Sequence, residues 1–459
     1  MSEMTTSAED QASGGALRKL ITIASSAAFG GLMFGFDVAI ITGAGPFIEK
    51  RFGLSELDLG VAFSALLFGC VIGAAGAGPL AERIGRRFTL IGVALVFALT
   101  TLATGAASSF AVFVIARFLG GLAVGAVSLA APMYISEIAP ARLRGRLGAL
   151  YQMALVSGIL VSYLINFGLK DAGPDAWRYM FYTGVLPAVV FLGLMLLAPE
   201  SPRFLVKSGR EQDALAVLRS ISGETQARAE LASIAESQSQ AHAPAVRLTS
   251  AGVIKPLWVS FVLAILIHLS GVNTVIDYAP RIFASAGLDL HQALLSTIVI
   301  GVANFLFTGI SFWTIDRFGR RSLYLIGSIG MGLALSALAV AAIMGAFQGG
   351  VVLILIIIYL LFFASCIGPV FWTLLPEIFP NAVRGRAMTV PVLTQWVANA
   401  VVVLFFPAIF QALGQAPTFG LLATACFAQA LFTYLVLPET RNVALEDVEA
   451  LWSRHGRRP

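Results

Sequence analysis

The sequence predicts an all-α membrane protein of 12 transmembrane helices, arranged as two six-helix halves. Three observations predict this fold. Apolar residues make up 58% of the 459 residues and charged residues 12%, well below the roughly 25% charged residues of a soluble domain. Apolar runs of about 20 residues, long enough to cross a bilayer, recur along the chain. Charged motifs at the ends of these runs are repeated between the halves, as in a duplicated membrane bundle.

Six apolar runs precede one polar insert and six follow it. The first six lie near residues 20–43, 59–80, 88–107, 110–134, 147–169 and 179–198. The second six lie near residues 256–284, 292–315, 322–345, 350–375, 387–411 and 417–437. The runs contain many small residues, which let helix backbones approach closely. The glycines of Gly120–Gly125 lie inside an apolar run with no preceding strand, so we interpret them as packing glycines and not as a nucleotide loop.

The polar segments complete the predicted domain organisation. Residues 1–17 are polar and lack the pattern of a signal peptide, so we expect a disordered cytoplasmic tail. The insert 199–255 contains apolar residues at helical spacing, which predicts two or three amphipathic helices at the cytoplasmic face. It separates the bundle of residues 18–198 from that of 256–437. Residues 438–459 form a cytoplasmic C-terminal tail with one more short amphipathic helix, Val443–Trp452.

Most of the 30 Lys and Arg residues fall in segments on one side of the predicted spans. The positive-inside rule then places both termini in the cytoplasm of a multi-pass protein of the plasma or inner membrane. This bias also explains the net charge of +5, which gives no reason to invoke nucleic acid. Cys70, Cys366 and Cys426 lie inside apolar runs and have no metal-ligand or disulfide spacing, so we expect neither a metal nor another cofactor.

Three charged motifs occur in both halves with nearly constant spacing. Residues 82–87 correspond to 316–321, residues 134–146 to 377–386, and residues 199–203 to 438–441. These charges could be solvated helix ends, but that does not require the same order twice. The duplicated charges point to a transporter. We predict that they form an inner gate, in which ion pairs join the two halves at the cytoplasmic end when a central cavity opens to the outside. Because an exposed pair contributes only about 0–1 kcal/mol, a network is needed. The gate residues are Glu82, Arg86, Glu137, Arg144, Glu200, Arg203, Asp316, Arg320, Glu377, Arg384 and Glu439.

Two opposite charges lie inside predicted spans. Asp37 sits about 26 Å along the outward-running first helix, and Arg117 about 10 Å below the outer end of the fourth, at 1.5 Å per residue. A lone charge at membrane depth costs at least about 2.5–3.5 kcal/mol, so we expect these two residues to pair in the outer third of the bilayer. The pair would either lock two helices together or bind and release a proton during transport.

The motifs resemble those of the sugar porter family of the major facilitator superfamily, over residues 18–452. The agreeing motifs, in order, are 35–37, 83–87, 199–203, 271–273 and 368–372. Bacterial proton-coupled xylose and hexose symporters look most similar. The resemblance implies the major facilitator fold and import of a monosaccharide, a pentose or a hexose, with protons by alternating access. It also implies that Asp37 and Arg117 couple transport to protons, since uncoupled facilitators commonly have a neutral residue at the Asp37 position.

Sugar hydroxyls need hydrogen-bond donors and acceptors, and sugar ring carbons pack on aromatic rings. Polar side chains of that kind are rare in these apolar runs, and each could instead join helices. The resemblance implies a sugar site made of Phe34, Gln152, His268, Asn273, Tyr278, Asn304, Gly368, Trp372, Gln395 and Trp396.

The chain departs from the family pattern at four places near this site. A glutamine pair is replaced by Ile267 and His268, a second glutamine by Ile159, a lid tyrosine by Asp277 and a glutamate by Gly184. Asp277 could form a local ion pair with Arg281, four residues on, or could face the substrate or bind a second proton. His268 could hydrogen-bond as a neutral ring or titrate. A cyclitol or another polyol therefore remains an alternative cargo.

Other function classes fit the sequence less well. An uncoupled facilitator would not need Asp37, and an exporter of organic anions would need more than the one intramembrane Arg117. A sensor usually has longer cytoplasmic tails. An enzyme is not expected, because no nucleophile with an adjacent base and no phosphate loop is present. The predicted partners are a small sugar, a proton and the lipid bilayer, and we expect a monomer.

Overall fold

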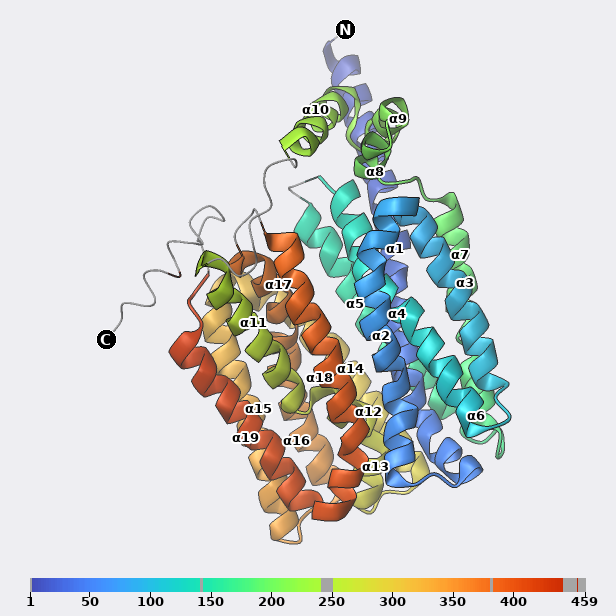
Figure 1. Ribbon diagram of the computed structural model, residues 1–459, viewed down its shortest axis with the longest axis vertical. Helices are drawn as coiled ribbons and strands as arrows, with labels where there is room; N and C mark the ends of the chain where they lie inside the picture. The colour runs from blue at the N-terminus through green and yellow to red at the C-terminus, as the bar shows by residue number, and fades with distance from the viewer. Residues whose placement is uncertain (1, 141–142, 241–250, 380–382, 441–451, 453–459) are drawn as a thin grey trace.

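The structure is a computed structural model that describes residues 2–140, 143–240, 251–379, 383–440 and 452. Every regular element among these residues is a helix. Twelve spans are long and apolar enough to cross a membrane, which confirms the predicted fold class. The N-terminal half, blue to green, and the C-terminal half, yellow to red, lie next to each other, and the helices of both run roughly parallel to the long axis of the molecule (Figure 1).

The N-terminal half contributes six spans, of which the sixth consists of two helices. They are α1 (Ser2–Phe52), α2 (Glu56–Ile84), α3 (Arg86–Gly105), α4 (Phe110–Ile138), α5 (Arg144–Leu169), α6 (Ala176–Tyr182) and α7 (Val185–Leu197). Helix α2 begins at a capping box, in which the Ser55 side chain accepts from the backbone N–H of Asp58 and the Asp58 carboxylate accepts from that of Ser55. It ends at Gly85, whose φ of 97° strongly favours glycine. The chain can therefore turn directly from α2 into α3.

The C-terminal half has two interrupted spans. Its helices are α11 (Ala251–Leu269), α12 (Val272–Asp277), α13 (Ala279–Ser285), α14 (Leu290–Phe318), α15 (Arg320–Ile343), α16 (Gly349–Phe362), α17 (Gly368–Ile378), α18 (Arg384–Leu413) and α19 (Gln415–Val436). Gly271, at a φ of 84°, separates α11 from α12. A π-helical turn, Phe363–Ile367, joins α16 to α17 just before Pro369, which has no N–H to continue the α-helical pattern.

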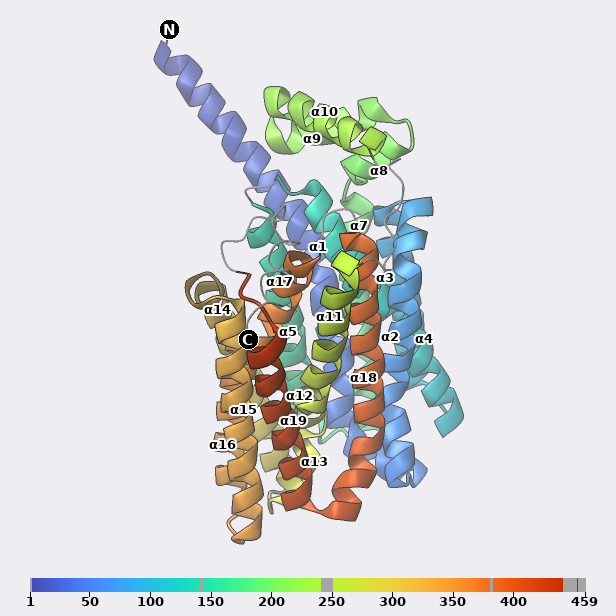
Figure 2. The ribbon, with the colours of Figure 1, turned by 60° about the vertical axis from the view of Figure 1, so that its left-hand side comes forward.

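Three short helices occupy the insert between the halves, as predicted. They are α8 (Pro202–Lys207), α9 (Glu211–Ser222) and α10 (Glu224–Gln240). Helices α9 and α10 lie across the end of the bundle from which the start of α1 projects (Figure 2). Ala214, Leu218 and Ile221 bury one face of α9, which accounts for the apolar spacing of the sequence. We call this end of the molecule the inner end and the opposite one the outer end.

The N-terminal tail differs from the expectation. Residues 2–17, predicted as a disordered tail, continue α1 as a helix. No proline interrupts this stretch, and adding a residue to an existing helix costs far less than starting one. Of the predicted C-terminal helix Val443–Trp452, all but Trp452 lies outside the described residues. The buried Trp452 indole donates to the carbonyl of Ile378 at 3.1 Å, at the inner end of α17.

Glycines bring neighbouring helices into backbone contact, as Gly120–Gly125 predicted. A Cβ added at Gly121 would lie 2.0 Å from the carbonyl oxygen of Leu66 on α2, and one at Gly125 would lie 2.3 Å from that of Cys70. The two halves meet in the same way, because a Cβ at Gly60 of α2 would lie 1.9 Å from the carbonyl oxygen of Leu404 on α18. Small residues therefore set both the packing inside a half and the seam between halves.

We predict that Gly121→Ala destabilises the protein by about 1–3 kcal/mol, since the added methyl group meets rigid backbone and the helices must move apart. Thermal unfolding in detergent would measure this. Gly92→Ala on α3 is the matched control, because no atom lies within 4 Å of its added Cβ and alanine favours a helix by about 1 kcal/mol. Equal unfolding temperatures for the two variants would contradict the prediction.

Candidate functional site

The two intramembrane charges form an ion pair inside the N-terminal half. Arg117 Nη1 on α4 donates to Asp37 Oδ1 on α1 at 2.8 Å, and Nη2 lies 3.3 Å from the Asp37 carbonyl oxygen. Both side chains are at most 5% exposed. The Phe181 ring lies 5.3 Å from the guanidinium carbon and adds a cation–π contact. The structure thus brings the side chains of Asp37 and Arg117 together, as their positions in the sequence predicted; their depth in the bilayer stays a prediction.

The chemistry open to this pair follows from its burial. Neither charge could remain alone at this depth without a large cost in solvation. A proton on Asp37 would remove the ion pair and leave Arg117 to find another acceptor. Arg117 Nε is already a buried donor without a hydrogen-bond partner. The site can therefore link proton binding to a rearrangement of α1 against α4.

The predicted sugar-site residues lie on seven helices of both halves. Phe34 is on α1, Gln152 on α5, His268 on α11, Asn273 on α12, Tyr278 between α12 and α13, Asn304 on α14, Gly368 and Trp372 on α17, and Gln395 and Trp396 on α18. One pair meets across the halves, since the Phe34 and Trp396 rings have centroids 5.7 Å apart. Trp372 is 43% exposed. His268 is buried, and neither ring nitrogen has a hydrogen-bond partner.

Tyr278 occupies a different setting from the other predicted sugar contacts. Its ring stacks on Phe63 of α2 with centroids 4.4 Å apart, and on Phe406 of α18 at 5.3 Å. Its hydroxyl donates to the carbonyl oxygen of Val403 at 3.0 Å. In this conformation Tyr278 therefore seals the seam between the halves on the outer side.

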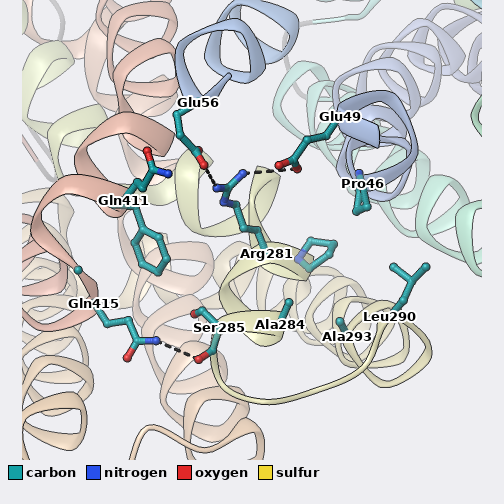
Figure 3. Close-up of a pocket in the computed structure, with 13 residues that line it drawn as sticks. Pro46, Glu49, Glu56, Arg281, Ala284, Ser285, Leu290, Ala293, Gln411 and Gln415 are labelled. Atoms are coloured by element: carbon teal, nitrogen blue, oxygen red, sulfur yellow. Dashed lines mark hydrogen bonds and ion pairs between the residues drawn. The ribbon is translucent and has the colours of Figure 1, made fainter. Parts of the chain in front are cut away.

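Arg281 makes the second outer contact between the halves. Its guanidinium lies between Glu49 at the end of α1 and Glu56 at the start of α2, beside a cavity of about 820 Å³ (Figure 3). Nη1 is 3.5 Å from Glu49 Oε2, and Nη2 contacts Glu56 Oε1 closely. The expected local pair of Asp277 with Arg281 is therefore wrong. The helix breaks at Tyr278, so the two side chains do not share one continuous helical face.

The inner charges of the N-terminal half form one cluster. Glu200 Oε1 accepts from the backbone N–H groups of Arg86 and Arg87 at 3.0 and 3.1 Å, where the positive end of the α3 dipole favours an anion. Arg86 Nη2 donates to Glu137 Oε1 at 2.9 Å, and the Ser201 hydroxyl donates to the other Glu137 oxygen.

The C-terminal half repeats this cluster. Glu439 Oε1 accepts from the backbone N–H of Arg320 at 2.9 Å, at the start of α15. Arg320 Nη2 donates to Glu377 Oε1 at 2.7 Å, and the Thr440 hydroxyl donates to Glu377 Oε2 at 2.6 Å. These pairs join residues of the same half, so in this conformation they complete each half separately.

The remaining predicted gate residues make simpler contacts or lie outside the description. Glu82 pairs with Lys207 of α8 at 3.1 Å, and Arg144 Nε donates to the Ser136 carbonyl oxygen at 3.1 Å. Arg203 is exposed on α8. The side chains of Asp316 and Arg384 lie outside the described part of the chain. The predicted pairing across the halves concerns the outward-open conformation and stays a prediction.

Some residues of these sites were missed in the sequence. Ser201 and Thr440 had a usable signal, because each follows the glutamate of a repeated Pro-Glu motif. Glu49 and Glu56 had none, since they flank the first loop like ordinary solvated ends. Glu56 also lies 225 residues from its partner, Arg281. Local spacing does not predict such a contact.

Comparison with known proteins places these features in a family. The family model described as "Sugar (and other) transporter" matches residues 23–452. The chain is 34% identical to the arabinose-proton symporter of Bacillus subtilis, covering 94% of this chain and 95% of that one. It is 35% identical to the D-xylose-proton symporter of Escherichia coli, covering 94% and 96%.

Solved structures of a relative have the same fold. The inward-open conformation of the xylose transporter XylE from E. coli, 34% identical, matches with a TM-score of 0.84 over 94% of this chain and all of that one. The proton:xylose symporter XylE bound to 6-bromo-6-deoxy-D-glucose, also 34% identical, matches with a TM-score of 0.80 over 94% of this chain and 99% of that chain.

We predict that Arg281→Gln shifts the protein toward conformations with an open outer end, by roughly fivefold in population. The reason is that two partly exposed ion pairs between the halves together contribute about 1 kcal/mol. Double electron–electron resonance between spin labels at Asp171 and Leu290 would measure this, because the nearby Phe167 and His291 rings meet across the seam at 5.0 Å.

Arg178→Gln is the control for the loss of an outer positive charge, because Arg178 pairs with Asp175 of its own half. An unchanged label distance in Arg281→Gln, or an equal change in the control, would overturn the role of Arg281. The three native cysteines are buried, so a thiol-reactive spin label should attach to the cysteines introduced at the two label positions.

Proposed function

Because the chain belongs to the sugar transporter family of the major facilitator superfamily, we propose that it imports a monosaccharide, a pentose or a hexose, together with protons. The observation that carries the proposal is the buried ion pair of Asp37 and Arg117, which provides a proton acceptor inside a membrane span. The names of the relatives, which include arabinose-proton and xylose-proton symporters, support the same substrates.

The proposed cycle alternates between an open outer end and an open inner end. With the outer end open, a proton from outside binds Asp37, and Arg117 loses its ionic partner. A sugar meanwhile binds at the seam between the halves, where polar groups replace its water and the Phe34 and Trp396 rings pack on its carbons. The outer contacts of Tyr278 and Arg281 then close, and the inner end opens to release sugar and proton.

The inner clusters would act in the opposite phase. In the structure, Arg86–Glu137 and Arg320–Glu377 are satisfied within their own halves. We propose that these groups exchange some partners across the seam when the inner end closes, as the duplicated motifs suggest. Both pairs are largely buried, so their groups would need new partners on leaving them, and the network as a whole would bias the two states.

The proposed orientation follows from the basic residues at the inner end. That end would face the cytoplasm, together with both termini and the helices α8–α10. The protein would work as a monomer in the bacterial inner membrane, with no macromolecular partner required.

Uptake into proteoliposomes tests the function directly. Labelled xylose, glucose and inositol would be offered with the outside acidified and then without a pH gradient. Accumulation above equilibrium that requires the gradient would support symport and identify the cargo class. Equilibration of a sugar without any effect of the gradient would instead make the protein an uncoupled facilitator. Uptake of inositol alone would favour a cyclitol carrier.

We predict that Asp37→Asn abolishes accumulation driven by the gradient and retains sugar exchange at equilibrium. Asparagine cannot bind the proton, but it can still accept a hydrogen bond from Arg117, so the local geometry should survive. Asp171→Asn is the control, since that carboxylate is 84% exposed at the outer end. Full accumulation by Asp37→Asn would exclude Asp37 as the coupling residue.

A further inference from the structure

Asp277 is a buried carboxylate of the C-terminal half that the proposed cycle does not yet use. It is 5% exposed at the end of α12. The nearest cation along the chain, Arg281, is held by Glu49 and Glu56. Among the residues that the structure describes, Asp277 takes part in no hydrogen bond or ion pair. Its charge, if present, would therefore lack a direct counter-ion.

Tyr163 of α5 is a side chain of the N-terminal half that senses the charge of Asp277. The Tyr163 ring lies at the seam, since a Cβ added at Gly301 of α14 would be 2.8 Å from its Cδ2 atom. Its hydroxyl lies near the Thr42 hydroxyl of α1 and within electrostatic range of the Asp277 carboxylate. Asp277 is thus within electrostatic range of a side chain that packs across the seam.

The neighbourhood of Tyr163 is unusually polar for a membrane span. Four buried polar atoms there have no hydrogen-bond partner: Thr42 Oγ1, Ser162 Oγ, Tyr163 OH and Asn166 Oδ1. Helices α1 and α5 approach closely here, because a Cβ at Gly43 would lie 2.5 Å from side-chain atoms of Asn166. Asp37 is six residues before Gly43 on α1, so this polar cluster lies on its outer side. Buried polar groups without a protein partner commonly bind an ordered water or an ion.

The charged and titratable groups around Asp277 leave it without a dedicated partner. Arg117 of α4 attracts it electrostatically but is bound to Asp37 of α1. Helix α11 contributes His268, whose ring nitrogens have no hydrogen-bond partner, α13 contributes Arg281, and Tyr278 follows in the chain. Helix α18 has no titratable residue between Ala387 and Leu413, and Glu49 of α1 is taken by Arg281.

The solvation of the Asp277 carboxylate therefore differs between the open and the closed state of the outer seam. When the outer end is open, water can solvate the ionised carboxylate. When the seam is closed, as here, an ionised carboxylate would be buried without a counter-ion, which is costly. A protonated acid avoids that cost and gains an O–H donor.

We propose that Asp277 is a second proton-binding site, loaded from the outer side, whose protonation allows the outer seam to close. A proton from external water adds to one carboxylate oxygen of Asp277, and it returns to external water when the seam reopens. This inference rests on the proposed transport cycle and adds to it a proton on the C-terminal half. It makes closure of the outer end depend on external pH.

The test follows seam closure without sugar or a gradient. Spin labels at Asp171 and Leu290 report the closed-to-open ratio in nanodiscs as a function of pH. One linked proton makes this ratio rise by up to about tenfold per unit fall in pH. We expect Asp277→Asn to reduce the slope by about one proton and Asp277→Glu, which keeps the acid, to restore it. In Asp37→Asn, the part of the pH dependence that comes from Asp277 should remain. An Asp277→Asn slope equal to that of the parent would overturn the proposal.

A second measurement keeps the proposal testable if Asp277→Asn does not fold. Infrared difference spectra between high and low pH detect the C=O band of a protonated carboxylic acid, and Asp277→Glu should shift that band. An unshifted band would exclude protonation at this position. The two proposals also fail separately. Absence of gradient-driven uptake by the parent protein would reject symport, whereas loss of all pH dependence in Asp37→Asn would reject Asp277.

Discussion

The structure depends on one constraint, which is that the interior of a bilayer cannot solvate charge. Twelve spans are apolar throughout most of their length, and their charges are gathered at the ends or paired. The buried pair of Asp37 and Arg117 is stable because each group supplies what water would otherwise provide. The same constraint makes the pair sensitive to protonation, since a single proton on Asp37 would remove the ionic attraction that holds the two side chains together.

The inner clusters show how the same rule operates at a helix end. Glu200 and Glu439 accept from the first backbone N–H groups of α3 and α15, which have no partner inside their helices. The glycine before each helix places the carboxylate against the backbone, because a Cβ at Gly85 would lie 2.3 Å from Glu200 Oε2. Each motif is therefore a helix cap with an arginine and a second glutamate attached. Such a unit can be duplicated with its half.

Much of this organisation could be predicted from the sequence, and the exceptions have physical causes. Hydropathy predicts the spans, and depth along each helix predicts that Asp37 meets Arg117, because both quantities are local. The Asp277–Arg281 pair was wrong because the spacing rule for ion pairs assumes a continuous helix, and the chain breaks at Tyr278. The partners of Arg281 could not be predicted, since they depend on how the two halves dock. The predicted sugar site faces the same limit, as its residues come from both halves.

The docking of the halves also limits the proposed coupling, because a proton on Asp37 would not by itself move one half against the other. Asp37 and Arg117 belong to the same half, so a rigid rotation of one half against the other leaves their pair intact. Arg281, by contrast, must leave Glu49 and Glu56 whenever the outer end opens. A signal from the pair has to cross the seam through groups that touch both halves. Tyr163, packed against Gly301 and within electrostatic range of Asp277, is such a group, and the polar cluster around it lies on the outer side of Asp37. Coupling by this route requires a titratable partner in the C-terminal half, and Asp277 has the position and the burial to be that partner.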